Sequence, residues 1–250
     1  MNALMSAELL KIRTTRAPWI AGPIVLVLAA VIPVVNGALA GTGDVPALTP
    51  GTLLDFVRGP VQLTGAAVLL LGLLASAGEF RHRTVLLSRL ASPRAGQVFA
   101  AKVGAIALLG LVAGVAVNVV SLLSGTAVLQ AHSVPVHITS GGVPYSLLVA
   151  PLATAAYGVF GVVVGTLIRS TAGAVGAVLT WAFVIEGVLP VIARSPHLAD
   201  RLPSSALKAV ITEHPIAGAT SPAVAALLLA AYLAALVLAA AVVDRRKELA

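Results

Sequence analysis

Long apolar runs separated by short polar segments dominate this chain. Residues 17–43 contain no Asp, Glu, Lys or Arg, and the same holds for residues 59–78. A helix that crosses about 30 Å of hydrocarbon needs roughly 20 apolar residues, so each run is long enough for one span. Because the runs lack the alternating polarity of membrane-barrel strands, they predict transmembrane helices.

The longest run must contain more than one span, because residues 103–168 include 66 positions without Asp, Glu, Lys or Arg. Its segment "QAHSVPVHITSGGVP", with Pro, Gly and His residues, predicts a loop between two helices. Two further apolar runs follow it. The six predicted spans are approximately 17–40, 59–78, 103–127, 144–168, 171–193 and 221–243. The pattern predicts an all-α, polytopic integral membrane protein in which residues 1–250 form a single transmembrane domain.

Composition supports a membrane protein and excludes some chemistry. Of the 250 residues, 59% are hydrophobic and only 10% are charged, whereas a soluble domain carries about 25% charged residues. The chain has too few polar groups to cover a surface that faces water on all sides. It contains no cysteine, so a disulfide framework and a thiolate metal site are excluded.

The net charge of +7 is unevenly distributed, and the distribution predicts the orientation of the chain. Basic residues in short loops are retained on the cytoplasmic side. Twelve of the Lys and Arg residues fall on one side of the predicted spans: Lys11, Arg13, Arg16, Arg81, Arg83, Arg89, Arg94, Lys102, Arg169, Arg245, Arg246 and Lys247. The other four are Arg58, Arg194, Arg201 and Lys208. We therefore expect a multi-pass protein with both termini in the cytoplasm, and no nucleic-acid partner.

The N-terminal polar segment "NALMSAELLKIRTTR" has helical character. Met5, Leu9 and Ile12 recur at helical spacing, while Glu8 and Lys11 fall elsewhere. A basic helix with a narrow apolar stripe can lie in the membrane interface, with its cations facing anionic headgroups. Residues 1–16 are therefore predicted to form an interfacial helix. The alternative is a topology signal that happens to be helical.

The segment "EFRHRTVLLSRLASPR", residues 79–94, gathers five charges in a chain that has few. Retention of basic residues could explain it as an ordinary loop. Yet the connection between Gly78 and Lys102 exceeds the 2–8 residues that are typical between helices. We expect a structured cytoplasmic element within residues 79–101, with Glu79 near the N-terminal end of a short helix, where the dipole favours an acid.

The motifs of these two segments resemble those of type-2 ABC transporter permease subunits. "AELLKIRTTRAPW" before the first span and "EFRHRTVLLSRLASPRAGQVFAAK" after the second carry the resemblance, which extends over nearly the full chain. It implies an elbow helix containing Glu8, Lys11 and Arg13. It also implies a coupling helix between spans 2 and 3 that docks on a separate ATPase. The coupling residues would be Glu79, Arg81, Arg83, Thr84 and Arg89. Many relatives have a Gly where this chain has Arg83.

The resemblance also implies an assembly and a location. Permeases of this type act in pairs, so the partners would be an ABC ATPase and a second permease protomer, identical or related, in a bacterial plasma membrane. The pair would form the pathway of an ATP-driven exporter. Residues 194–220, with "LPSSALKAV", would form an outer loop with a short helix.

The chain has no phosphate-binding loop of its own. Such a loop places a Lys directly after a Gly, whereas the four lysines here follow Leu, Ala, Leu and Arg. A non-catalytic subunit without a cofactor is expected, with ATP hydrolysed on another chain. His132 and His137 share a loop, but a structural zinc site takes four ligands, so no metal site is expected.

Polar and small residues inside the apolar runs have two interpretations each. Glu186 could lie in the outer half of a transport pathway or be a hydrated acid near the interface. Asn118 and Gln62 could contact substrate or form interhelical hydrogen bonds. The pairs Gly110/Gly114 and Gly161/Gly165 could allow close packing within the chain or between protomers.

Two other functions remain open at this point. A proton- or ion-coupled secondary transporter would show buried ionisable residues, discontinuous helices and internal repeats, and the sequence has one acid near a span edge and no clear repeat. A non-transporting membrane scaffold would not need the long segment 79–101 between the second and third spans.

Overall fold

The computed structural model describes residues 2–43, 45–81, 95–139, 142–185 and 221–246, together with 188, 191–192, 202, 206 and 210–211. Its elements in chain order are α1 (Asn2–Thr14), α2 (Arg16–Leu39), α3 (Thr52–Arg81), α5 (Ala95–Ala131), α6 (Val143–Ile168), α7 (Thr171–Leu179), the π-helical η1 (Thr180–Ile185) and α11 (Pro222–Arg246). No strand occurs among the described residues. The all-α prediction is confirmed for this part of the chain.

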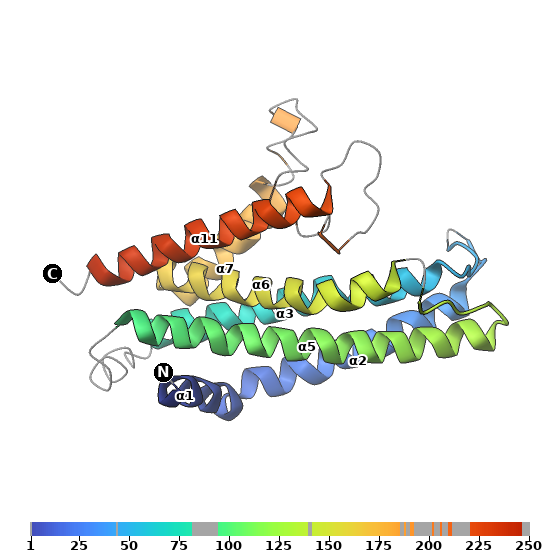
Figure 1. Cartoon of the computed structure of the whole chain (residues 1–250), viewed down its shortest axis with the longest axis horizontal. Coiled ribbons are helices and arrows are strands. Elements are labelled where there is room, and N and C mark those ends of the chain that lie inside the picture. Colours follow the sequence, from blue (N-terminus) through green and yellow to red (C-terminus); the bar gives the residue numbers. More distant parts are fainter. Residues whose placement is uncertain are drawn as a thin grey trace.

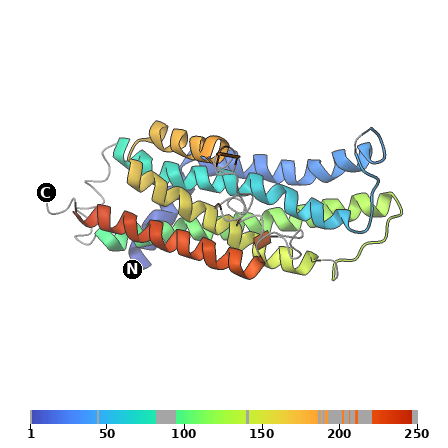
Figure 2. The ribbon, with the colours of Figure 1, turned by 90° about the horizontal axis from the view of Figure 1, so that it is seen from above.

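Five helices are long and apolar enough to cross a membrane by length and composition: α2, α3, α5, α6 and α11. They run roughly along one axis, side by side (Figures 1 and 2). The start of α5 and the ends of α3, α6 and α11 lie at the same end of the bundle as α1 (Figure 1). We call this the basic end, because Lys11, Lys102, Arg169 and Arg245 belong to the elements that meet there.

The predicted division of the longest run is confirmed, because α5 ends at Ala131 and α6 begins at Val143. The helices extend beyond several predicted spans. α3 has 30 residues and α5 has 37, and at about 1.5 Å per residue both exceed the hydrocarbon thickness. Polar residues such as Asp55 and Lys102 lie inside them, so charge does not mark where these helices end.

One prediction about local structure is wrong, and a second is tested only in part. Glu79 lies in the last turn of α3, not at the start of a separate short helix. Of the predicted fifth span, 171–193, the described residues 171–185 are helical: α7 runs to Leu179 and the π-helical η1 continues to Ile185. This described stretch is too short to be counted among the five candidate spans.

The centre of the bundle is α6, which packs between α3 and α5 through glycines. A Cβ at Gly161 would lie 2.0 Å from the carbonyl oxygen of Leu69, and one at Gly165 would lie 2.7 Å from that of Leu73, both in α3. A Cβ at Gly114 of α5 would lie 2.6 Å from the Cα of Pro151. Small residues let helix backbones approach closely in membranes. Both predicted glycine pairs therefore pack within the chain.

Prolines inside two helices leave backbone carbonyls without their usual donors, and α5 supplies donors to both. Pro151 has no N–H for the carbonyl of Leu147, four residues earlier. The Asn118 side chain donates to that oxygen at 3.1 Å. Pro33 likewise releases the carbonyl of Ala29, which accepts a 3.3 Å hydrogen bond from the Ser124 hydroxyl. Such satisfaction from a neighbouring helix is what allows proline inside a membrane helix.

Candidate functional site

The corner between α1 and α2 is stabilised by side chains that bind the last carbonyls of α1. Carbonyls near the end of a helix are open to additional donors, and that of Lys11 already accepts the N–H of Thr15 at 3.0 Å. The hydroxyl of Thr14 donates to the carbonyl of Leu10 at 2.9 Å, and that of Thr15 donates to Lys11 at 2.6 Å. The Trp19 indole donates to the carbonyl of Arg13 at 2.7 Å. These bonds fix the direction in which α1 leaves α2.

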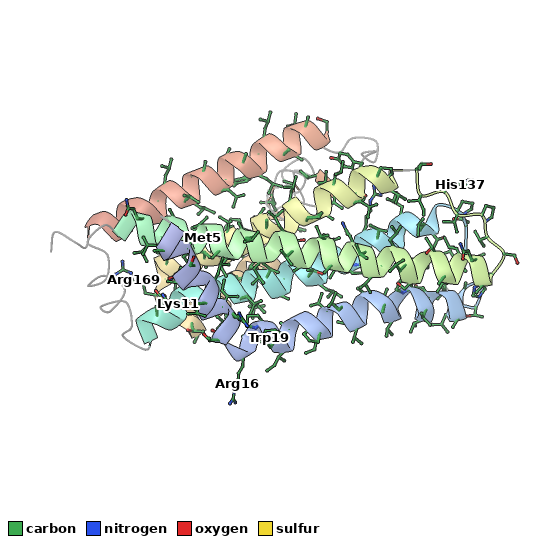
Figure 3. All side chains as sticks on the ribbon, turned by 60° about the horizontal axis from the view of Figure 1, so that its bottom comes forward. Met5, Lys11, Arg16, Trp19, His137 and Arg169 are labelled. Carbon is green, nitrogen blue, oxygen red and sulfur yellow. The ribbon has the colours of Figure 1, made fainter. Side chains whose placement is uncertain are left out.

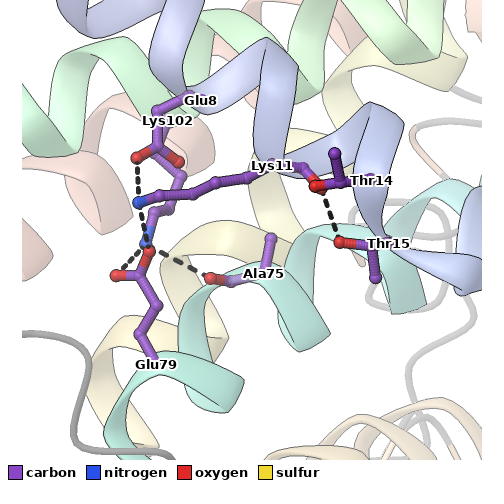
Figure 4. Close-up of polar contacts among 7 residues, drawn as sticks. All are labelled: Glu8, Lys11, Thr14, Thr15, Ala75, Glu79 and Lys102. Atoms are coloured by element: carbon purple, nitrogen blue, oxygen red, sulfur yellow. Dashed lines mark hydrogen bonds and ion pairs between the residues drawn. The ribbon is translucent and has the colours of Figure 1, made fainter.

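Four charged side chains from three helices meet beside this corner, and we call them the charge cluster: Glu8, Lys11, Glu79 and Lys102 (Figure 4). The Lys11 ammonium lies 2.6 Å from Glu8 Oε1 and 2.9 Å from Glu79 Oε1. Lys102 Nζ lies 2.5 Å from Glu79 Oε2 and donates to the carbonyl of Ala75 at 3.2 Å. Glu79 therefore joins α3 to both α1 and α5.

The cluster lies within the helix packing. The side chain of Lys102 is 8% exposed and that of Glu8 is 9% exposed, whereas that of Lys11 is 46% exposed. Buried charges are costly unless they are paired and hydrogen-bonded, and each of these has an ionic partner. Met5 of the apolar stripe of α1 lies toward α5, because a Cβ at Gly104 would be 3.2 Å from Met5 Cε.

The pKa of Lys11 reflects these neighbours. Burial lowers this pKa, but hydrogen bonds and charge from Glu8 and Glu79 outweigh burial, so the net pKa lies above the ordinary lysine value. A raised lysine pKa means that the ammonium is stabilised by folding. Its contribution is fully present below the ordinary pKa and is lost only as the pH rises through the raised one. Lys11 therefore stays protonated in the cluster at neutral pH.

A cavity of about 580 Å³ adjoins the cluster. Glu8, Lys11, Glu79 and Lys102 line one part of it, and apolar side chains such as Leu71, Leu74 and Ile106 line another. Helices α1, α2, α3 and α5 contribute residues, and Thr171 adds the start of α7. The arrangement can bind a molecule that combines polar and apolar parts.

The sequence placed Glu8 and Lys11 in one group and Glu79 in another, and the structure brings all three together. Lys102 belongs to the same cluster, although the sequence indicated only its cytoplasmic side and its place at the end of the motif "EFRHRTVLLSRLASPRAGQVFAAK". Its position between Ala and Val in an apolar helix start was the available signal. Arg13 is exposed, and Arg16 points away from the bundle (Figure 3).

Three predicted coupling residues, Arg83, Thr84 and Arg89, lie outside the described residues. For Arg81 the structure describes only its place at the end of α3. The predicted outer-loop helix also falls largely outside the described residues. Within it, the backbone at Ala206 is helical, and its N–H donates to the carbonyl of Leu202 at 2.8 Å.

The three predicted pathway residues have different environments. Asn118 is buried and its amide nitrogen binds the carbonyl of Leu147, which is an interhelical bond. Its Oδ1 has no hydrogen-bond partner within the part of the chain that the structure describes. Gln62 is exposed on the outside of α3. Glu186 lies outside the described residues.

No group of three or more His, Cys, Asp or Glu side chains that could hold a metal occurs among the residues described. His132 Nδ1 lies 2.9 Å from the carbonyl of Val128, and His137 lies at the end of the bundle opposite to Lys11 (Figure 3).

Compared with known proteins, the chain matches no protein-family model and no curated protein sequence.

Proposed function

We propose that this chain is the transmembrane permease subunit of an ATP-driven exporter of the type-2 ABC class, acting as a pair of protomers with a separate ATPase. The proposal has residues 1–16 as an elbow helix at the cytoplasmic face and residues 79–101 as the coupling segment. The motifs of these segments and the lack of a phosphate-binding loop in the sequence support it. Both termini would lie in the cytoplasm.

The strongest structural support comes from the ends of α3 and α5 and from the ion pairs of Glu79. α3 and α5 are longer than a membrane crossing requires, and the end of α3 at Arg81 and the start of α5 at Ala95 both lie at the basic end of the bundle. Glu79, in the last turn of α3, is ionically joined to Lys11 of α1 and Lys102 of α5. Force applied to residues 82–94 by a motor would therefore reach α1, α3 and α5 together. This is what an ATP-driven conformational change requires.

The test is association with an ATPase and its dependence on the coupling segment. The chain would be co-expressed with an ABC ATPase encoded next to it, purified in detergent, and assayed for bound ATPase and for ATP hydrolysis. We expect Arg81→Glu combined with Arg83→Glu to abolish co-purification, since acids replace the bases offered to the partner. Arg13→Glu combined with Arg16→Glu is the matched control, because both residues are exposed near the same end.

Two outcomes would contradict the proposal. Undiminished association of the Arg81/Arg83 variant would remove the docking role of this segment. Transport by the purified chain alone in vesicles, driven by an ion gradient without ATP, would favour a secondary transporter instead. Equal loss in both double variants would indicate a general charge effect, which also contradicts a specific docking surface.

A further inference from the structure

Two cavities adjoin each other along α2, α3 and α5. The larger, about 580 Å³, contains the charge cluster, and the smaller, about 90 Å³, lies beside it. Pro18, Leu71 and Leu109 line both. The smaller cavity has Thr64 as its one polar side chain among otherwise apolar or glycine residues, and the Thr64 hydroxyl donates to the carbonyl of Pro60 at 2.7 Å. The two cavities together are polar at one end and apolar at the other.

The polar end can accept a phosphate group. A lysine ammonium has three donors, and the bonds of Lys102 to Glu79 and to the carbonyl of Ala75 use two of them. One donor therefore remains for an oxygen acceptor in the cavity that Lys102 lines. Because two lysines and two glutamates make the cluster neutral as a whole, it favours a ligand that is neutral as a whole as well.

The apolar end suits a short stretch of a hydrocarbon chain, because about 90 Å³ has room for roughly three groups of the size of water. Ala67, Val68 and Ala113 line it together with Ala21 and Val25 of α2. α2 also exposes large apolar side chains to the outside of the bundle, including Trp19, Ile20 and Ile24. A chain lying here would lie among helices that are themselves apolar enough to cross a membrane.

We propose that these two cavities bind one zwitterionic phospholipid molecule, with its headgroup beside the charge cluster and one acyl chain against Ala67 and Ala113. The phosphate takes the remaining donor of Lys102, and the headgroup ammonium lies toward Glu8, which pairs with Lys11 through Oε1. This site does not depend on the proposed transport function, because it requires no ATPase and no second protomer.

Native mass spectrometry of the purified, delipidated chain tests the site. The probes are dioleoyl phosphatidylethanolamine, anionic dioleoyl phosphatidylglycerol, soluble glycerophosphoethanolamine and inorganic phosphate. We expect saturable binding of one phosphatidylethanolamine per chain, and phosphatidylglycerol binding weaker by about fivefold or more. Neither soluble probe should bind saturably, because neither can fill the apolar end.

Two variants locate the lipid. Ala113→Leu fills the apolar cavity and should weaken phosphatidylethanolamine binding by about tenfold or more. The matched control is Ala234→Leu, the same change on the exposed face of α11, which should leave binding within about twofold. Lys102→Met removes the phosphate donor and should weaken phosphatidylethanolamine binding by about fivefold or more. Thermal unfolding of each variant separates loss of binding from loss of folding.

The proposal is overturned if the wild-type chain shows no saturable lipid binding, or if Ala113→Leu and Ala234→Leu bind equally. Binding of glycerophosphoethanolamine or phosphate as tight as that of the lipid would assign the cavity to a soluble phosphate compound. Preference for phosphatidylglycerol would exclude a zwitterionic ligand. A folded Lys102→Met variant with unchanged affinity for phosphatidylethanolamine would remove the headgroup assignment.

Discussion

Helices α6 and α11 have nearly the same length and a similar apolar composition, but their surroundings differ. α6 has 26 residues and α11 has 25. In the apolar windows of the two helices, 44% of the residues of α6 are buried by the chain, against 11% for α11. α6 lies between α3 and α5, whereas α11 lies on the outer side of α6 (Figure 1).

The difference follows from where glycines stand. α6 contains Gly158, Gly161 and Gly165 at spacings of three and four, and each lies against the backbone or side chains of a neighbour. α11 contains no glycine. Since lipid tails are as apolar as leucine, hydropathy alone gives helices no reason to associate in a membrane. Hydropathy therefore identifies the spans, and in this pair glycines, not small residues in general, mark the helix that packs closely, because α11 is rich in alanine.

The largest loss of stability is expected when a single methyl group is added where α6 lies against α3. Gly161→Ala would place a Cβ 2.0 Å from the Leu69 carbonyl oxygen, so α6 and α3 must separate. We expect a loss of about 2–3 kcal/mol in the free energy of unfolding. Unfolding in detergent micelles by added sodium dodecyl sulfate measures it.

Gly176→Ala is the matched control for that change. A Cβ at Gly176 in α7 meets nothing within 4 Å, and alanine is better than glycine in a helix by roughly 0.5–1 kcal/mol. The control should therefore be neutral or slightly more stable. If both variants lose the same stability, the close α3–α6 approach does not hold and the comparison with α11 fails.

A smaller loss should come from the bond between α5 and α6. Asn118→Leu leaves the carbonyl of Leu147 unsatisfied, and we expect a cost of about 1 kcal/mol. In a Pro151→Ala background, the new N–H can bind that carbonyl within α6. The same Asn118→Leu change should then cost less than half as much.

Equal cost of Asn118→Leu in both backgrounds would contradict the assigned role of Asn118. Free energies of unfolding for the four chains of this double-mutant cycle provide the measurement. The test also bears on the comparison of α6 with α11. α11 contains no proline after Pro222, so every carbonyl inside it keeps its usual backbone donor and needs none from a neighbouring helix.

Much of the fold could be predicted from the sequence, because long charge-free runs identify apolar helices directly. The division between α5 and α6 was predictable since Pro, Gly and His cluster there. Helix ends were not, because α3 and α5 continue through residues such as Arg58 and Lys102. Beyond the hydrocarbon, a polar residue is compatible with a helix, and hydropathy contains no information about where the helix stops.

The charge cluster could not have been predicted from spacing. Lys11 and Glu79 are separated by 68 positions, and their contact depends on how α1 folds back at Thr15. The role of Asn118 was partly accessible, since a proline always releases the carbonyl four residues earlier. Which donor reaches that carbonyl depends on the rotation of α5 against α6, and the sequence does not report it.

α2 is intermediate between α6 and α11. Only 17% of its apolar window is buried, yet Ser124 of α5 donates a hydrogen bond to one of its carbonyls. Ser124→Ala removes the donor to the carbonyl of Ala29. The hydroxyl also lies 2.9 Å from the carbonyl of Val120, so its single hydrogen is shared. We expect a loss of about 0.5 kcal/mol, measured by the same unfolding assay. A loss as large as that of Asn118→Leu would mean that α2 depends on α5 as strongly as α6 does.

The smallest effect should come from α11. Ala234 is exposed there, and Ala234→Leu adds an apolar side chain where lipid would accept it. We expect a change in the free energy of unfolding within about 0.5 kcal/mol. The same substitution at Ala155 of α6, which is buried and lies against Gly110 of α5, should cost about 1–3 kcal/mol, because no space is available for the larger side chain. A cost at Ala234 equal to that at Ala155 would show that α11 is enclosed by protein in the folded chain, and the contrast between the two helices would then disappear.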